Sequence, residues 1–216
     1  MNDLTERRLE EKERRRIEIL DAAEAVAEVV GIEAMTMDQV ARKARLSRAL
    51  IYLYVQDKSD LILAICERAL KDLHQRFELA ATTRLLGIEK VDVCGRAYVT
   101  FAAELPARFE ALALLETYTT SGQNEHSYKA CIAAGNRVQG VLVTSIEQGL
   151  RDGSIRSDAG SPTLIGFVLW GLMHGLIQLT ITKKGNLQDK GLDAKQLIEQ
   201  GFVMATWALS PERLKQ

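Results

Sequence analysis

The sequence is poor in cysteine and in proline, with three residues of each among 216. Cys66, Cys94 and Cys131 lie far apart and show no CxxC spacing, so they fit buried, reduced thiols better than a disulfide framework or a zinc site. The opening segment, MNDLTERRLEEKERRR, lacks the apolar core of an export signal. These absences favour a cytoplasmic protein without a metal centre.

Motifs of catalysis are missing as well. The chain has no HExxH, no glycine-rich phosphate loop and no GxSxG elbow, and none of its three histidines stands near a cysteine or serine in a motif. We therefore expect no enzymatic activity and no cofactor. The net charge is only −1, so binding to any anionic polymer would have to come from a local basic patch.

Apolar residues recur at steps of three and four along almost the whole chain, without an alternating strand pattern or a solenoid repeat. The first such helix runs from Ile17 to Val30 and ends at Gly31. Before it, TERRLEEKERRR carries Glu–Arg pairs four residues apart that could extend the helix. We favour a solvated or frayed arm there over an arm that contacts DNA. The sequence predicts an all-α fold.

Three helix starts follow one another closely after Gly31. Thr36 and Gln39 have the spacing of a capping box, in which the hydroxyl and the amide satisfy backbone groups of the first turn. Ser47 is the next N-cap and predicts a third helix to about Tyr54, and Asp57 caps a fourth helix. The short elements from Thr36 to Tyr54 therefore resemble a helix pair joined by a tight turn.

This pair has the residues that a helix-turn-helix requires. Ala41 is small enough to let the helices approach, and Ile51 is large enough to fill the gap between them. With Leu46, Ile51 and Val55 inside, helical spacing turns a second set outward. That outward set is Arg48, Ala49, Leu50, Leu53 and Tyr54.

The outer surface of the pair is basic. No acidic residue occurs between Asp38 and Asp57, whereas the same stretch holds Arg42, Lys43, Arg45 and Arg48. A short basic helix of this kind suits the DNA major groove, with phosphates on either side. The alternative is that Leu50 and Leu53 pack into a larger core and the arginines are only solvated.

The segment RRIEILDAAEAVAEVVGIEAMTMDQVARKARLSRALIYLYVQDKSDLI, 15–62, decides between these readings because it resembles the DNA-binding domain of the TetR (tetracycline-repressor-like) family of bacterial regulators. The matching positions are Ile19-Leu20, Ala22-Ala23, Gly31, Thr36, Val40-Ala41, Ala44, Leu46-Ser47, Ile51-Tyr52, Tyr54, Lys58 and Leu61. The resemblance covers about a quarter of the chain and is specific only as a set. It implies a sequence-specific DNA-binding regulator, with a helical protein–protein adaptor as the alternative.

The resemblance also assigns roles to individual residues. Those it implies for DNA binding are Thr36, Arg45, Ser47, Arg48, Ala49, Leu50, Tyr52, Tyr54 and Lys58. Hydroxyl groups, phenols and the lysine would contact phosphates, while Arg48 would pair with guanine and its two neighbours would meet a thymine methyl group. Three residues depart from the family pattern: Arg45 replaces the usual glycine of the turn, Leu53 a frequent histidine, and Val55 a usual phenylalanine.

A second informative stretch is SPTLIGFVLWGLMHGLIQLTIT, Ser161–Thr182, which has no charged residue and is about long enough to span a bilayer. It also contains Gln178, His174 and three glycines, and it is the sole such run in a chain of amphipathic helices. We favour a helix buried between its own domain and a partner subunit over a membrane-spanning helix.

For the remainder of the chain, the resemblance implies the division of labour of the family. Residues 1–56 would form a three-helix DNA-binding domain, joined rigidly by the fourth helix to a ligand-binding and dimerisation domain, 57–216. The ligand pocket would use Phe101, Leu115, Tyr118, Trp170, Met173, His174 and Gln178. A homodimer interface would use Gly171, Gly175, Phe202 and Thr206. We expect a repressor of a palindromic operator in double-stranded DNA, released by a small, largely apolar effector.

Overall fold

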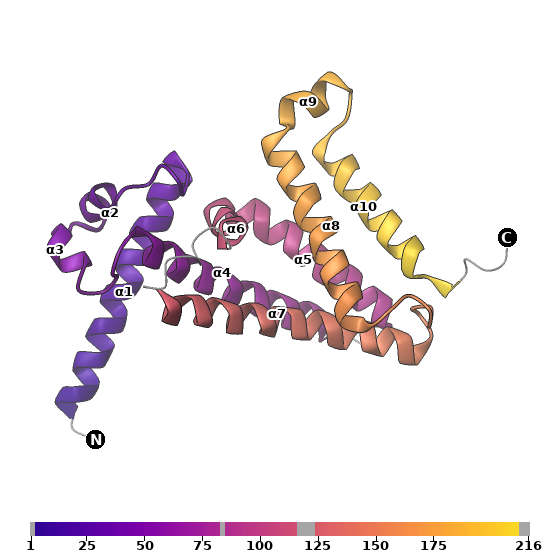
Figure 1. Ribbon diagram of the computed structural model, residues 1–216, viewed down its shortest axis with the longest axis horizontal. Helices are drawn as coiled ribbons and strands as arrows, with labels where there is room; N and C mark the ends of the chain where they lie inside the picture. Colours follow the sequence, from indigo (N-terminus) through magenta and orange to yellow (C-terminus); the bar gives the residue numbers. More distant parts are fainter. Residues whose placement is uncertain (1–2, 83–84, 116–123, 212–216) are drawn as a thin grey trace. The chain divides into compact units, whose positions relative to one another are not determined.

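In the computed structural model, which describes residues 3–82, 85–115 and 124–211, the ordered backbone is helical and these residues form no strand (Figure 1). The helices are α1 (Asp3–Val30), α2 (Met37–Ala44), α3 (Arg48–Ile51), α4 (Lys58–Ala81), α5 (Gly87–Glu104), α6 (Pro106–Ala113), α7 (Glu125–Asp152), α8 (Pro162–Thr182), α9 (Lys184–Asp189) and α10 (Ala194–Leu209). The all-α prediction is confirmed.

Several helices begin at the N-terminal capping residues or prolines that their sequence suggests. The capping box of Thr36 and Gln39 is formed, Ser47 and Ser161 accept from backbone N–H groups three residues on, and Pro106 opens α6. An unforeseen capping box at Asp193 opens α10.

Two helix boundaries were predicted wrongly. The α-helix after Ser47 ends at Ile51 instead of Tyr54, because the chain tightens into turns with i→i+3 hydrogen bonds at Leu53 and Tyr54. The pair Gly185-Asn186 in the sequence predicts the end of the long apolar helix, but α8 ends at Thr182 and Gly185 lies within the additional short helix α9.

The chain divides into two compact units. One contains residues 1–71 and 105–134, and the other contains 72–104 and 135–216. The first unit thus adds α6 and the beginnings of α4 and α7 to the three helices predicted as a domain. The functional boundary between residues 56 and 57 stays a prediction, since compactness does not test it.

In the first unit, α1 packs against α2 and α6 around a small aliphatic core. Ile19, Met35, Val40 and Ile51 have at most 1% of their surface exposed. Polar contacts tie the same elements together, because Glu24 accepts from Arg108 at 3.0 Å and the carboxylate of Glu110 accepts from the backbone N–H of Ile32 at 3.1 Å. The helix-turn-helix therefore rests on a fixed base within this unit.

In the second unit, glycines bring the helices close together. A Cβ atom on Gly87 would lie 2.0 Å from the backbone nitrogen of Gly149, so α5 and α7 touch through their backbones there. A Cβ on Gly95 would lie 2.7 Å from the ring of Phe202, which is buried under the guanidinium of Arg96, 4.4 Å from the ring centroid. Phe202 is therefore part of this unit's own core.

Candidate DNA-binding surface

The turn between α2 and α3 carries the strain that the sequence suggested. Arg45 adopts φ +56° and ψ +37°, and it is the one described residue other than glycine with positive φ. The backbone N–H groups of Arg45 and Leu46 donate to the carbonyls of Arg42 and Ala41, at 3.2 and 3.0 Å, and close the turn. A left-handed arginine costs about 1–2 kcal/mol relative to glycine, yet the turn geometry is complete.

The interior of the helix-turn-helix is as predicted in its main features. Ile51 is fully buried, Val55 is 4% exposed and Ala41 is 6% exposed. Leu46 is only half-buried. The smaller valine in place of the family's phenylalanine thus still closes the base of α3.

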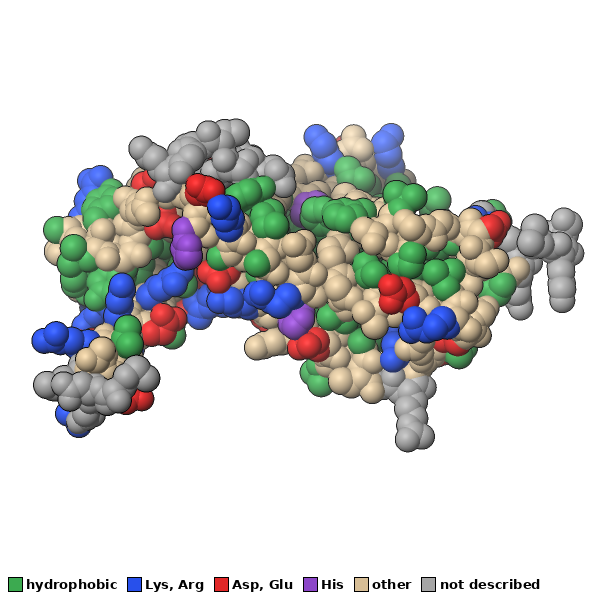
Figure 2. Space-filling model, turned by 60° about the horizontal axis from the view of Figure 1, so that its bottom comes forward, with side chains coloured by type: hydrophobic (Ala, Val, Ile, Leu, Met, Phe, Trp, Pro, Cys, Tyr) green, Lys and Arg blue, Asp and Glu red, His purple; other side chains and the backbone are tan. Residues whose placement is uncertain are grey.

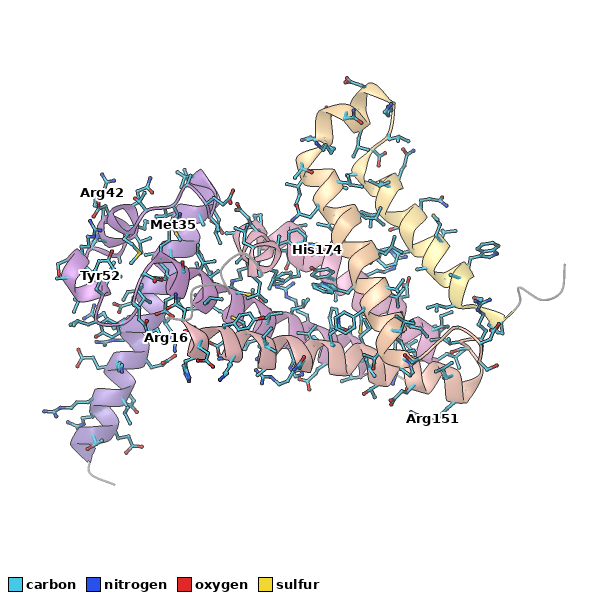
Figure 3. All side chains as sticks on the ribbon, viewed as in Figure 1. Arg16, Met35, Arg42, Tyr52, Arg151 and His174 are labelled. Carbon is cyan, nitrogen blue, oxygen red and sulfur yellow. The ribbon has the colours of Figure 1, made fainter. Side chains whose placement is uncertain are left out.

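The outward face of α3 offers both charge and apolar surface. Arg48 and Ala49 are exposed and Leu53 is 74% exposed, whereas Leu50 and Tyr54 are half-buried. Leu53 therefore does not belong to a larger core within the chain, which removes the main support for the alternative reading of this helix. Arg42, Lys43 and Arg45 are exposed on the neighbouring elements. Figure 3 labels Arg42 and Tyr52 at this end of the first unit.

Arg48 is held in place by two neighbours. Its Nη2 donates to the Tyr52 hydroxyl at 3.2 Å, and its Nη1 lies 3.3 Å from Oδ1 of Asp38. The hydrogen bond with Tyr52 and the charge of Asp38 raise the pKa of Arg48 above its ordinary value. Asp38 was not singled out from the sequence, although it is the one acidic residue at the start of α2.

The remaining predicted contact residues sit at helix starts. Thr36 and Ser47 are exposed N-caps whose side-chain oxygens accept from Gln39 N, at 3.3 Å, and Leu50 N, at 3.1 Å. Lys58 opens α4, and its Nζ donates to the carbonyl oxygen of Glu33. Helix N-termini with free N–H groups attract phosphate. The structure thus places the predicted DNA-binding residues at the two ends of α2, on α3 and in the turns after it, and in the first turn of α4, within one compact unit.

The predicted ligand residues of the second unit form part of an aromatic cluster. The Tyr98 hydroxyl and Nδ1 of His174 are 2.7 Å apart, and the Tyr98 ring stacks near Phe101 and His174 with centroids 6.3 Å from each. Trp170 lies 6.0 Å from His174 between ring centroids. Burial raises the pKa of Tyr98 and lowers the pKa of His174.

Other members of the predicted pocket lie elsewhere. Met173 is buried and Gln178 is half-buried on α8, whereas Leu115 is half-buried in the first unit. Tyr118 lies outside the described residues. Tyr98 was missed, although it stands three residues before Phe101 and so shares its helix face.

Of the predicted interface residues, three are exposed. Gly171 and Gly175 on α8 have open space beside them, and Thr206 on α10 is exposed, whereas Phe202 faces inward as described above. Around them lies a set of exposed apolar side chains, which we name the α8–α10 apolar surface. Its members are Leu164, Phe167, Val168, Val203, Met204 and Trp207, each at least 53% exposed.

An exposed basic recognition helix on a buried helix-turn-helix frame defines the protein as a helix-turn-helix DNA-binding protein. Residues 19–65 match the model of "Bacterial regulatory proteins, tetR family", and residues 91–204 match that of "Tetracyclin repressor-like, C-terminal domain". The chain belongs to the TetR family of DNA-binding transcriptional regulators. A comparison with curated proteins gives no match.

Solved structures share this fold over nearly the whole chain. A protein of unknown function from Rhodococcus sp. RHA1 is 20% identical, with a TM-score of 0.73 over 91% of this chain and 95% of its own. The regulator FadR from Bacillus subtilis, in complex with stearoyl-CoA, is 16% identical, with a TM-score of 0.67 over 89% and 98%. AibR, in complex with isovaleryl coenzyme A and operator DNA, is 19% identical, with a TM-score of 0.65 over 88% and 97%.

Proposed function

We propose that the protein is a cytoplasmic, homodimeric repressor that binds a palindromic operator and leaves it when an acyl-bearing, largely apolar effector binds. The observation that carries this proposal is the exposed face of α3, together with the capped helix starts at Thr36 and Ser47. We assign the chain a regulatory and not a catalytic role. Its family is regulatory.

To contact a base, the Arg48 side chain would have to leave Asp38 and Tyr52. Its contacts with Asp38 and Tyr52 are exposed, and exposed ion pairs add little to stability. The guanidinium can therefore leave them cheaply for the O6 and N7 atoms of guanine, a bidentate contact that discriminates by about 1–3 kcal/mol. Ala49 and Leu50 would meet thymine methyl groups beside it.

Dimerisation would cover the α8–α10 apolar surface. One helix of this surface, α8, is long and apolar enough to cross a membrane, and only 28% of its most apolar window is buried within the chain. The remaining apolar area needs a cover, and a second copy supplies one while giving the two recognition helices that a palindrome requires. Gly171 and Gly175, which have open space beside them, would allow the partner helix to approach closely.

The effector would bind in the second unit near the Tyr98–His174 pair. An apolar site with a few polar groups suits a small amphipathic ligand. Phe101 and Trp170 would contact an acyl chain, while the Tyr98 hydroxyl and the His174 imidazole would hydrogen-bond a polar carbonyl. Two structural relatives bind acyl-CoA compounds, which supports this ligand class.

Release from the operator would be a population shift. A ligand that binds better to the dimer with a different spacing of recognition helices must weaken operator affinity, and the operator must weaken ligand affinity by the same factor. A ligand that binds both forms equally would have no effect on DNA binding.

The experiment that tests the DNA-binding part is selection from a pool of random duplex DNA, followed by sequencing of the retained duplexes. The proposal predicts an enriched palindrome that is lost from the pool when Tyr52→Phe and Lys58→Ala are combined. Salt-sensitive retention without any enriched sequence would contradict it and favour a helical adaptor. Addition of stearoyl-CoA to the selected complex then tests release.

A further inference from the structure

The amino-terminal part of α1 projects beyond the core of the first unit. Every residue from Thr5 to Arg14 is exposed, and α1 continues as regular helix to Asp3 (Figure 1). The arm is solvated, as expected, and its backbone extends the helix and is not frayed. Arg16, labelled in Figure 3, lies where this projection meets the unit, 3.7 Å from Glu67 of α4.

Helix formation places three cations of this projection on one face and three carboxylates on the opposite side, while Arg7, Glu11 and Arg14 lie between them. Arg8, Lys12 and Arg15 follow one another at steps of four and three residues and therefore share one face. The acidic residues lie on the opposite side of the helix at the same steps. They are Glu6, Glu10 and Glu13. A segment of mixed charge in the sequence thus becomes a helix with a basic face, which we define as Arg8, Lys12 and Arg15.

The basic face is aligned with the interior of the helix-turn-helix unit. The next positions on the same face are Ile19, fully buried, and Ala22, 6% exposed, and α1 packs against α2. The basic face therefore continues outward from the packed face of α1 and not from its solvent face. Figure 2 shows Lys and Arg side chains gathered around this end of the first unit, at the left.

Two of the three cations have no internal partner. Arg15 donates to Glu18 at 2.8 Å, whereas Arg8 and Lys12 take part in no ion pair or hydrogen bond with any residue that the structure describes. Seven residues separate Arg8 from Arg15, or about 11 Å of helix at about 1.5 Å per residue. One DNA strand carries a phosphate every ~3.4 Å along the duplex axis, so about three phosphates fit this length.

We propose that the basic face of α1 binds the phosphate backbone of the operator beside the segment read by α3. This inference rests on the proposed function, because it requires a duplex docked on α3. The contact is with phosphates alone, so it adds affinity and salt dependence without adding base preference. The carboxylates of Glu6, Glu10 and Glu13 disfavour binding of the opposite side of the helix to DNA.

The test uses the full-length protein and the duplex recovered by selection. Arg8→Ala combined with Lys12→Ala should lower operator affinity about 10-fold and reduce the slope of log K against log salt by about 2 per protomer, at about 0.9 for each phosphate contact. The enriched sequence should stay unchanged. Ethylation interference should lose a patch of phosphate contacts in the double variant.

Arg14→Ala is the control. Arg14 is also exposed, but it lies on another face, near Glu11 and Glu18, and its loss per charge removed is compared with that of the double variant, which removes two charges. It should leave the slope almost unchanged. An equal loss per charge from Arg14→Ala, or no loss from the double variant, would overturn the inference. If the wild type itself enriches no sequence, the proposed function fails instead, so the two failures are distinct. Alanine favours helix, and far-ultraviolet circular dichroism of the variants checks that the fold is retained.

Discussion

The helix-turn-helix and the α8–α10 apolar surface present opposite chemistry to their surroundings. On α2, α3 and the turn between them, exposed positions carry four cations, Arg42, Lys43, Arg45 and Arg48. On α8, no residue is charged, and the exposed side chains include Leu164, Phe167 and Val168. By the proposed function, a polyanion would cover the first surface and a second copy of the chain would cover the second. In one all-helical chain, the exposed side chains, cationic in one region and apolar in the other, therefore determine which partner each region can bind.

The largest expected effect comes from placing a charge on the α8–α10 apolar surface. Val168→Asp should convert the dimer to a monomer and weaken operator binding at least about 100-fold, because an unpaired carboxylate is costly to bury in an interface. Sedimentation velocity and a DNA-binding titration measure the two effects. Val29→Asp introduces the same change at an exposed position of α1, and it should leave the dimer intact. Equal dimerisation of both variants would refute the assigned interface.

Next in size is the close packing of α5 and α7. Gly87→Ala should lower the free energy of unfolding by about 3 kcal/mol, since the new methyl group would meet the backbone of Gly149 and force the helices apart. Gly140→Ala is the control on α7, where no atom lies within 4 Å of the added Cβ. It should raise stability by about 0.5–1 kcal/mol. Denaturant unfolding measures both changes. An unchanged free energy of unfolding in Gly87→Ala would show that α5 and α7 do not touch through their backbones at Gly87 and Gly149.

A smaller effect on stability is expected at the turn of the helix-turn-helix. Arg45→Gly should stabilise the protein by about 1 kcal/mol, because glycine adopts the left-handed conformation without the steric cost that arginine meets. Operator affinity should fall at the same time through the lost cation. In contrast, Arg42→Gly, inside α2, should destabilise by about 1 kcal/mol. Thermal unfolding of both variants checks the opposite signs.

The smallest expected effect concerns acid stability of the second unit. Hydrogen bonds from Ser154 and from the backbone N–H of Gly87 hold the pKa of Asp152 at about 2, below its ordinary value of 3.8. This stabilisation is present above about pH 4 and is lost as the pH falls toward 2, because the folded form binds the proton more weakly than the unfolded form. In the Asp152→Asn variant, the midpoint of unfolding should therefore decrease less steeply than in the wild type as the pH falls over this range. An unchanged pH profile would assign the acid sensitivity to other carboxylates.

Local patterns predicted the helix-turn-helix well, for physical reasons. Caps such as Thr36 and Ser47 are decided within a few residues, and the spacing of Ala41 and Ile51 fixes how the two helices pack. The positive φ of Arg45 agrees with the glycine that the family usually has at this position.

Contacts between distant helices escaped prediction. Phe202 looked suitable for an interface, but its burial depends on Gly95, more than a hundred residues earlier, and on Arg96. Tyr98 pairs with His174 from another helix, and no local spacing reveals that pair. The two charged faces of α1 needed only the observation that the segment is helical.

Sedimentation of labelled duplexes measures how many protomers bind the selected operator. We predict that protomers bind the palindrome in pairs, and that a duplex with only one half-site binds far more weakly. Val168→Asp should abolish the paired binding and leave weak contact with single half-sites. Independent binding of single protomers, with the same affinity for one half-site as for two, would contradict the claim that the uncovered apolar surface joins two DNA-reading units.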